Sequence, residues 1–270
     1  MKKLWEENRP LTITGCLMFV AFLLSLAGLV LDPRVITGAP AWLKPAKFGI
    51  STAIYAFTIA WIFTWIPGQA RLKMLVGWIT SIVLVLEVAI IDLQAARGVT
   101  SHFNNHTPFD AALFGIMGIA ILIAWGASIA LTVALFRTRF DDRAMGWALR
   151  LGLLITVFGA AVGGVMVTPT KPQLAEARAG HPLTTTGAHT VGGPDGGPGM
   201  IGTGWSREHG DLRVSHFFGL HAMQILPILT WLFFRRRPGW VIAAGSVYGA
   251  VLIFLFAQAM AGQPFLGGIL

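Results

Sequence analysis

The sequence predicts an all-α polytopic membrane protein, a bundle of seven transmembrane helices with its N-terminus in the cytoplasm and its C-terminus outside. The chain of 270 residues is 55% hydrophobic and only 12% charged, about half the charged fraction of a soluble domain. Its apolar residues gather into runs of about 20, enough to cross a hydrocarbon core about 30 Å thick as a helix. Its basic residues concentrate between alternate runs. We expect one integral membrane domain over residues 1–270.

The expected spans follow from the length of each apolar run. They lie at about 11–31, 47–66, 74–95, 109–136, 146–168, 214–234 and 239–261. A Gly-rich loop at about 169–213 separates the fifth span from the sixth. The first run exceeds the roughly 7–15 apolar residues of a signal peptide and follows a segment of mixed charge, so we expect it to be retained as a helix.

The distribution of basic residues predicts the orientation. Twelve of the twenty lysines and arginines lie in the N-terminal segment or in the loops after the second, fourth and sixth spans. These twelve are Lys2, Lys3, Arg9, Arg71, Lys73, Arg137, Arg139, Arg143, Arg150, Arg235, Arg236 and Arg237. The positive-inside rule places them in the cytoplasm. We therefore expect a multi-pass protein of a bacterial-type inner (plasma) membrane, with lipids rather than nucleic acid as the partner of its net charge of +8.

The first two spans carry few groups that suggest chemistry. Cys16, in the first span, is the sole cysteine, which excludes an intramolecular disulfide and multi-cysteine metal sites. Lys44 and Lys47 flank the start of the second span. They either extend their charges to the interface as ordinary boundary lysines or bind an anionic headgroup or substrate.

The third span carries Glu87, the only acidic residue expected deep in the membrane. An ionisable group at that depth costs several kcal/mol unless it is paired or protonated, and is a functional candidate by default. Gln94 follows at i+7 on the same face. Asp92 lies nearer the interface on another face. We assign Glu87 a catalytic or proton-carrying role and Gln94 a role in cofactor binding.

The fourth and fifth spans show helix-start and packing signals. Thr107, Pro108 and Asp110 are typical of an N-cap, a proline at the first helical position and an acidic third residue. In the fifth span, Gly159 and Gly163 have the small-xxx-small spacing that lets helices approach closely. The loop at 169–213 has apolar anchors, and we expect a partly ordered lid rather than a flexible tether.

The sixth span, which enters from the outer side, carries His216, His221 and Gln224. His221 and Gln224 share a face at i and i+3. All seven histidines of the chain fall on the predicted outer side, including His102 and His106 in the turn before the fourth span. We expect a cofactor site of His216, His221, Gln224 and Gln94, and a metal site of His102, His106 and His221.

Glu87 and His221 are expected at matching depths. Each lies ten residues, or about 15 Å at 1.5 Å per residue, inside the outer boundary of its helix. If the third and sixth spans face each other, the two side chains meet, with Gln94 and Gln224 near and His102, His106 and His216 above. The alternative is a Glu–His pair that only stabilises the bundle.

Three functions fit these residues, and the sequence leaves open whether the protein is an enzyme. Helix bundles hold haem b between histidines, or a transition metal between histidine and carboxylate, so the first function is redox or electron-transfer chemistry, with a quinone as a possible partner. The second is a proton-coupled transporter in which Glu87 is protonated. The third is an accessory subunit of a larger membrane complex, bound to other membrane subunits. A rhodopsin is excluded, because the seventh span has no lysine for a Schiff base.

Overall fold

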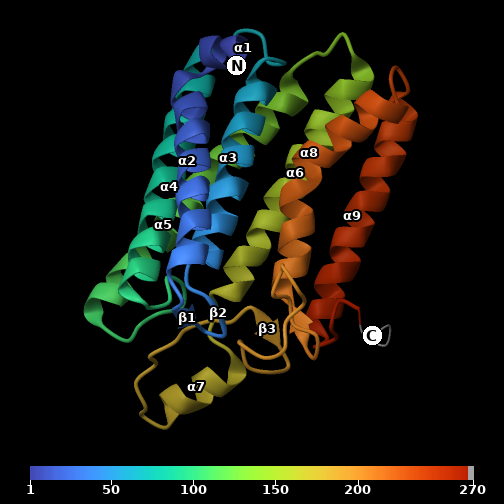
Figure 1. Cartoon of the computed structure of the whole chain (residues 1–270). Coiled ribbons are helices and arrows are strands. Elements are labelled where there is room, and N and C mark those ends of the chain that lie inside the picture. The colour runs from blue at the N-terminus through green and yellow to red at the C-terminus, as the bar shows by residue number, and fades with distance from the viewer. Residues whose placement is uncertain (267–270) are drawn as a thin grey trace. The chain divides into compact units, whose positions relative to one another are not determined.

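The computed structural model describes residues 1–266 (Figure 1). Within this range seven helices are long and apolar enough to cross a membrane. They are α2 (Arg9–Leu31), α3 (Leu43–Phe63), α4 (Ala70–Arg97), α5 (Pro108–Arg137), α6 (Arg143–Met166), α8 (Leu212–Phe233) and α9 (Pro238–Met260). The predicted all-α polytopic fold is confirmed, and each expected span falls on one of these helices.

The shorter elements lie outside the spans. Helix α1 (Lys2–Glu7) precedes α2, and strands β1 (Val35–Ile36) and β2 (Ala39–Pro40) form an antiparallel hairpin before α3. The loop after α6 contains α7 (Lys171–Arg178), β3 (Thr190–Val191) and β4 (Gly210–Asp211), the two strands pairing antiparallel. The Gly-rich loop therefore has secondary structure of its own.

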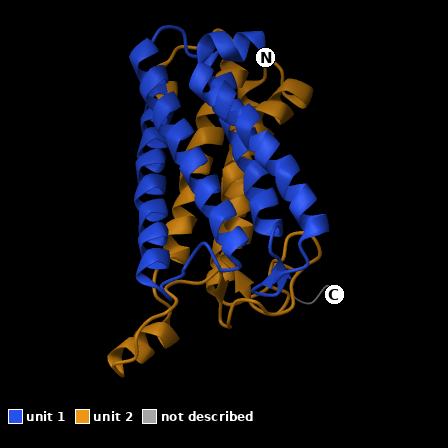
Figure 2. Cartoon of the chain, turned by 60° about the vertical axis from the view of Figure 1, so that its left-hand side comes forward, with its two compact units in different colours: residues 1–134 blue, residues 135–270 orange. Residues whose placement is uncertain are grey.

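The chain divides into two compact units, residues 1–134 and 135–270, shown in separate colours in Figure 2. The division falls near the end of α5, and each unit is described by itself. In the first unit, Met18, Ala53 and Val88 bring α2, α3 and α4 together. Ile91 of α4 and Met117 of α5 belong to a second buried cluster.

A carboxylate fixes the loop between α2 and α3. Asp32 accepts hydrogen bonds from the Arg34 guanidinium and, at 2.8 Å, from Trp42 Nε1. Arg34 Nη1 also donates to the carbonyl oxygen of Ala96, 2.9 Å away, near the end of α4. The hydrogen bonds from Arg34 and Trp42 hold the pKa of Asp32 well below its usual range. The loop is thus joined to α4.

In the second unit, α6 and α8 approach closely through paired glycines. A Cβ at Gly159 would lie 2.4 Å from the Cα of Gly219, too close for any side chain. Thr156 Oγ1 donates to the carbonyl oxygen of Gly219 at 3.2 Å. By contrast, a Cβ at Gly164 would meet nothing within 4 Å among the described residues. The predicted packing role is confirmed for Gly159.

Candidate functional site

Glu87 and His102 lie against each other in the first unit. Glu87 Oε1 is 3.4 Å from His102 Nε2, and the Glu87 residue is only 4% exposed. The other carboxyl oxygen, Oε2, is buried without a hydrogen-bond partner among the described residues. One oxygen therefore lies beside an imidazole while the other lies in the interior with its hydrogen-bonding capacity unused.

The turn between α4 and α5 brings His102 to this position. Helix α4 ends at Gly98, whose φ of 76° is the left-handed conformation typical of a C-cap. Glu87 lies about 15 Å below that end, so the turn must fold back toward the bundle for His102 to reach it. Ser101 and Asn104 are accordingly buried. Phe103, with φ 61°, occupies a left-handed conformation that is unusual for a bulky residue.

Aromatic rings surround the imidazole of His102. Its ring centroid is 5.7 Å from that of Phe48, 6.2 Å from that of Phe103 and 6.3 Å from that of Phe114. Ser101 Oγ lies 3.1 Å from His102 Nδ1. Rings from α3, from the turn and from α5 therefore fix the plane of the imidazole, and the serine fixes its second nitrogen.

Lys44 contributes a positive charge to the same region. Its Nζ lies 5.8 Å from the centroid of the Phe48 ring, in cation–π range, and Phe48 in turn packs against His102. An ammonium group thus lies next to the aromatic rings around the imidazole. Of the two roles considered for Lys44 from the sequence, the structure favours neither.

Gln94 is fully buried, and its side chain joins α4 to the start of α5. Its amide donates to Asp110 Oδ1 at 2.9 Å, and Arg97 donates both to Gln94 Oε1 and to Asp110 Oδ1. Thr107 Oγ1 accepts from the Asp110 amide at 3.1 Å, which confirms the predicted N-cap. In this structure the Gln94 side chain forms hydrogen bonds that link α4 to α5. Its role in cofactor binding stays a prediction.

Two further polar groups of α4 are buried without partners among residues 1–266. They are Ser81 Oγ and Asp92 Oδ1. At 1.5 Å per residue, Ser81 lies about 9 Å from Glu87 toward the start of α4, and Asp92 about 8 Å toward its end. Each group retains an unused hydrogen-bonding site within a span, a costly arrangement in hydrocarbon. At about 100° per residue neither group shares the helix face of Glu87, so the three are separate polar positions on α4.

His216 is held by α6 in the second unit. Its Nδ1 lies 2.8 Å from the carbonyl oxygen of Gly159. Because a carbonyl oxygen can only accept, Nδ1 carries the proton, and Nε2 is the acceptor nitrogen of the neutral ring. A Cβ at Gly163 would lie 3.5 Å from His216 Cε1, so this glycine also lies beside the imidazole. A backbone carbonyl behind one nitrogen is the usual way to orient a metal-binding histidine.

His221 lies one to two turns further along α8. Its ring packs edge-on against Phe217, with centroids 4.2 Å apart, and the side chain of Gln224 forms a hydrogen bond with it. The expectation that His221 and Gln224 share a face is confirmed. Phe217 in turn packs against Trp205 of the Gly-rich loop, with ring centroids 5.6 Å apart.

The predicted site residues are thus distributed over both units. Glu87, His102 and His106 belong to the first, and His216 and His221 to the second. The structure brings Glu87 together with His102. The meeting of Glu87 with His221 would join residues of different units and stays a prediction.

The metal site expected from His102, His106 and His221 also stays a prediction. The side chain of His106 is exposed, and its backbone amide donates to Asn104 Oδ1 at 3.1 Å. In the described part of the chain, no three histidine, cysteine, aspartate or glutamate side chains are grouped so as to hold a metal ion.

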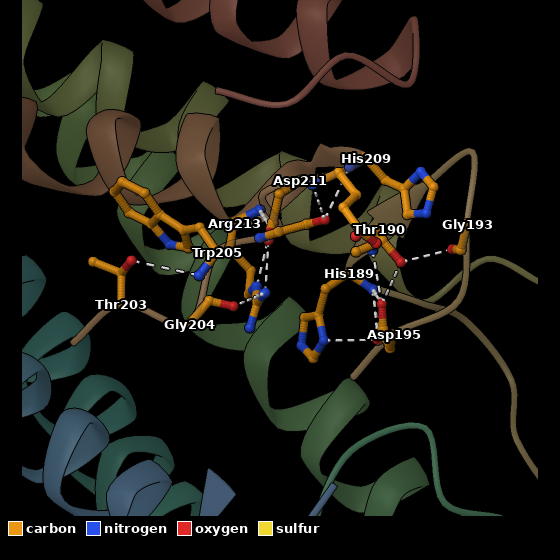
Figure 3. A network of polar contacts seen from close by, with 12 residues as sticks. His189, Thr190, Gly193, Asp195, Thr203, Gly204, Trp205, His209, Asp211 and Arg213 are labelled. Atoms are coloured by element: carbon orange, nitrogen blue, oxygen red, sulfur yellow. Dashed lines mark hydrogen bonds and ion pairs between the residues drawn. The ribbon is translucent and has the colours of Figure 1, made fainter. Parts of the chain in front are cut away.

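The Gly-rich loop is organised around two aspartates (Figure 3). Asp195 Oδ1 accepts from the amide of Thr190 at 2.8 Å, and Asp195 Oδ2 lies 2.9 Å from His189 Nδ1. Asp211 Oδ2 accepts from the amide of Ser206 at 2.8 Å and from Arg213 Nη2 at 2.6 Å. Burial raises the pKa of Asp195, but hydrogen bonds and the charge of His189 outweigh it and hold the pKa well below its usual range.

Replacing Asp195 with asparagine should loosen this loop. Because the folded pKa is lowered, the carboxylate stabilises the loop above the ordinary aspartate pKa of about 3.9. That stabilisation is lost as the pH falls through the folded pKa. At neutral pH, Asp195→Asn should speed hydrogen–deuterium exchange of the amides of His189 and Thr190 by about fivefold, equivalent to about 1 kcal/mol.

The control for this exchange measurement is Glu208→Gln, which removes an exposed carboxylate from the same loop. Its exchange at the same two amides should match that of the unmodified protein. Equal protection in the Asp195 and Glu208 variants would show that the carboxylate does not order the loop.

The contact between Glu87 and His102 was not predicted from the sequence, nor were the aromatic neighbours Phe48 and Phe114. The sequence does show two histidines in a short turn just after the helix that carries Glu87. The sequence does not show that this turn folds back along that helix, toward Glu87. The turn also holds Phe103 in a left-handed conformation, which composition does not reveal.

Comparison of the chain with protein-family models, with curated proteins and with solved structures found no match.

Proposed function

We propose that this multi-pass membrane protein binds and releases a proton at the Glu87–His102 pair and couples this exchange to transport across a bacterial-type inner membrane. One observation carries the proposal: a membrane-buried carboxyl group has Oε1 3.4 Å from an imidazole and Oε2 without a partner. With the N-terminus in the cytoplasm, the pair lies in the outer half of the membrane.

The chemistry of the pair suits proton exchange. A charged carboxylate in hydrocarbon is costly unless it is paired or protonated. Protonation of Glu87 removes its charge, and protonation of His102 pairs that charge with an imidazolium. Histidine is the side chain whose unperturbed pKa lies nearest neutral pH. The pair therefore has no net charge while it holds one proton, whichever group carries it, and has one negative charge after that proton is released.

Ser81 and Asp92 are further polar groups of α4 whose buried oxygen atoms lack partners among the described residues. At about 100° per residue they lie roughly 120° and 140° around the helix from Glu87, so neither shares its face. Asp92 lies on the side of the α4 C-terminus, where we expect the outer aqueous phase. The proposal therefore rests on the Glu87–His102 pair.

Reconstituted vesicles test this function. The protein is inserted into vesicles that contain a pH-sensitive dye, and a pH gradient is imposed with potassium and valinomycin to balance charge. Vesicles with the protein should equilibrate their internal pH faster than protein-free vesicles of the same lipid. Equal rates would contradict proton exchange across the bilayer.

A second function, haem- or metal-based electron transfer, is favoured by the geometry of His216. Its Nδ1 is bound to the Gly159 carbonyl oxygen, which orients Nε2 as an acceptor suited to haem b or a transition metal. His221, with Gln224 beside it, is a further candidate on the same helix, and a quinone would be a fitting electron partner.

This second function has a direct spectroscopic test. The purified protein should show a reduced-minus-oxidised difference spectrum, or contain stoichiometric metal, and the signal should be lost in His216→Ala. A colourless, metal-free preparation would contradict it and leave proton exchange as the supported function.

A further inference from the structure

An open cavity of about 420 Å³ lies at the N-terminal end of the first unit. It is lined by α1, by the start of α2 and by the start of α4. Its lining includes Glu6, Glu7, Arg9, Lys73 and Trp78. The cavity thus combines charged groups of both signs with an aromatic side chain at an end of the membrane-spanning helices.

Two of the four charged groups of the cavity form an ion pair with each other, and the other two are exposed. Lys73 Nζ lies 2.7 Å from Glu7 Oε2, and both side chains are largely buried. Glu6 and Arg9 are exposed, and the Arg9 guanidinium lies 5.8 Å from the centroid of the Trp5 ring. The four charged groups sum to zero, with one carboxylate and one guanidinium accessible to a ligand.

Asn8 gives the cavity a rigid base. Its side chain accepts from the amide of Leu11 at 3.0 Å and donates to the carbonyl oxygen of Lys73 at 3.0 Å. A Cβ at Gly77 would lie 2.2 Å from the Asn8 side chain, so α4 packs directly on it. The start of α2 and the start of α4 are therefore fixed relative to each other.

An apolar stripe leads away from the cavity along α4. Met74, Trp78 and Ile82 follow one another at i, i+4 and i+8, a spacing that places them on one helix face. They are 59%, 53% and 60% exposed. Met74 and Trp78 line the cavity itself, so its polar groups and the stripe form one continuous surface.

We propose that this surface binds a phospholipid whose headgroup carries a primary ammonium and a phosphate, as an ethanolamine lipid does. The ammonium binds Glu6, the phosphate binds Arg9, and an acyl chain lies along Met74, Trp78 and Ile82. A carboxylate accepts hydrogen bonds from a primary ammonium, whereas a choline headgroup has no N–H to donate. A glycerol headgroup is attracted by the basic residues near this end of the helices, such as Lys2, Lys3 and Arg71, but it has no ammonium to bind Glu6.

Native mass spectrometry of the protein tests the proposal. The detergent-solubilised protein is mixed with equal amounts of phosphatidylethanolamine, phosphatidylcholine and phosphatidylglycerol of the same acyl chains. The ethanolamine lipid should be retained about tenfold more than either of the others. Glu6→Gln should reduce that preference by about three- to tenfold, the effect of losing one charge-assisted hydrogen bond. Arg9→Gln should instead lower the retention of all three lipids by a similar factor, because each of them carries the phosphate.

Two matched variants control for charge alone. Asp141→Asn and Arg139→Gln remove exposed charges from the connection between α5 and α6, and both should keep the preference. Equal retention of the three lipids by the unmodified protein would overturn the proposal. So would an unchanged preference in Glu6→Gln, or an unchanged retention of all three lipids in Arg9→Gln.

Discussion

Replacing Gly159 with valine should force α6 away from α8 and strongly destabilise the second unit. Even the first carbon of a side chain would lie 2.4 Å from the Cα of Gly219 and 2.7 Å from its carbonyl carbon. Backbone atoms cannot move aside as a flexible side chain can, so the cost should exceed the usual range for overpacking and reach at least about 3 kcal/mol. The unfolding temperature should fall by roughly 6–12 °C.

Gly164→Val is the matched control, because it adds the same side chain to the same helix. A Cβ there meets nothing within 4 Å among the described residues, and the change should leave the unfolding temperature within about 2 °C. Thermal unfolding in detergent compares the two variants. Similar stability of the two would show that the contact between Gly159 and Gly219 does not hold α6 and α8 together.

Replacing Glu87 with glutamine should abolish the proton exchange proposed for this protein. Glutamine has nearly the same shape as glutamate but cannot bind or release a proton at neutral pH. Proton flux into reconstituted vesicles should fall by about 100-fold, the scale associated with loss of a positioned proton-transfer group. His102→Gln should reduce the flux less, because Glu87 remains able to bind a proton.

Glu176→Gln provides an internal control for that experiment. Glu176 also contacts a histidine, His181, at 2.5 Å, but both side chains are more than half exposed. The flux in this variant should equal that of the unmodified protein. A comparable loss in the Glu176 and Glu87 variants would indicate a general effect of removing carboxylates.

The membrane-spanning helices could be predicted because apolar length alone determines whether a segment can cross the bilayer. The bounds were less accurate, since a helix continues beyond the hydrocarbon. The third span was expected at about 74–95 and runs over Ala70–Arg97. Its last turn contains Arg97, whose bonds to Gln94 and Asp110 hold it in helix.

The candidate site could be predicted only in part. Glu87 was identified because a carboxyl group deep in a span is rare, a property that one sequence reveals. Its partner was expected to be His221, because depth along a helix can be counted. His102 was placed above the site, because the counting could not show that the turn folds back around Phe103. Tertiary packing of loops depends on backbone conformations that residue types only weakly restrict.

Infrared spectroscopy of the carboxyl groups tests the central claim most directly. Difference spectra are recorded as the pH is changed, for the unmodified protein, for Glu87→Gln and for Glu176→Gln. We expect the unmodified protein and the Glu176 variant to share a carboxylic-acid band that appears on acidification, and we expect Glu87→Gln to lack it. The same difference spectrum in all three proteins would contradict proton binding at Glu87.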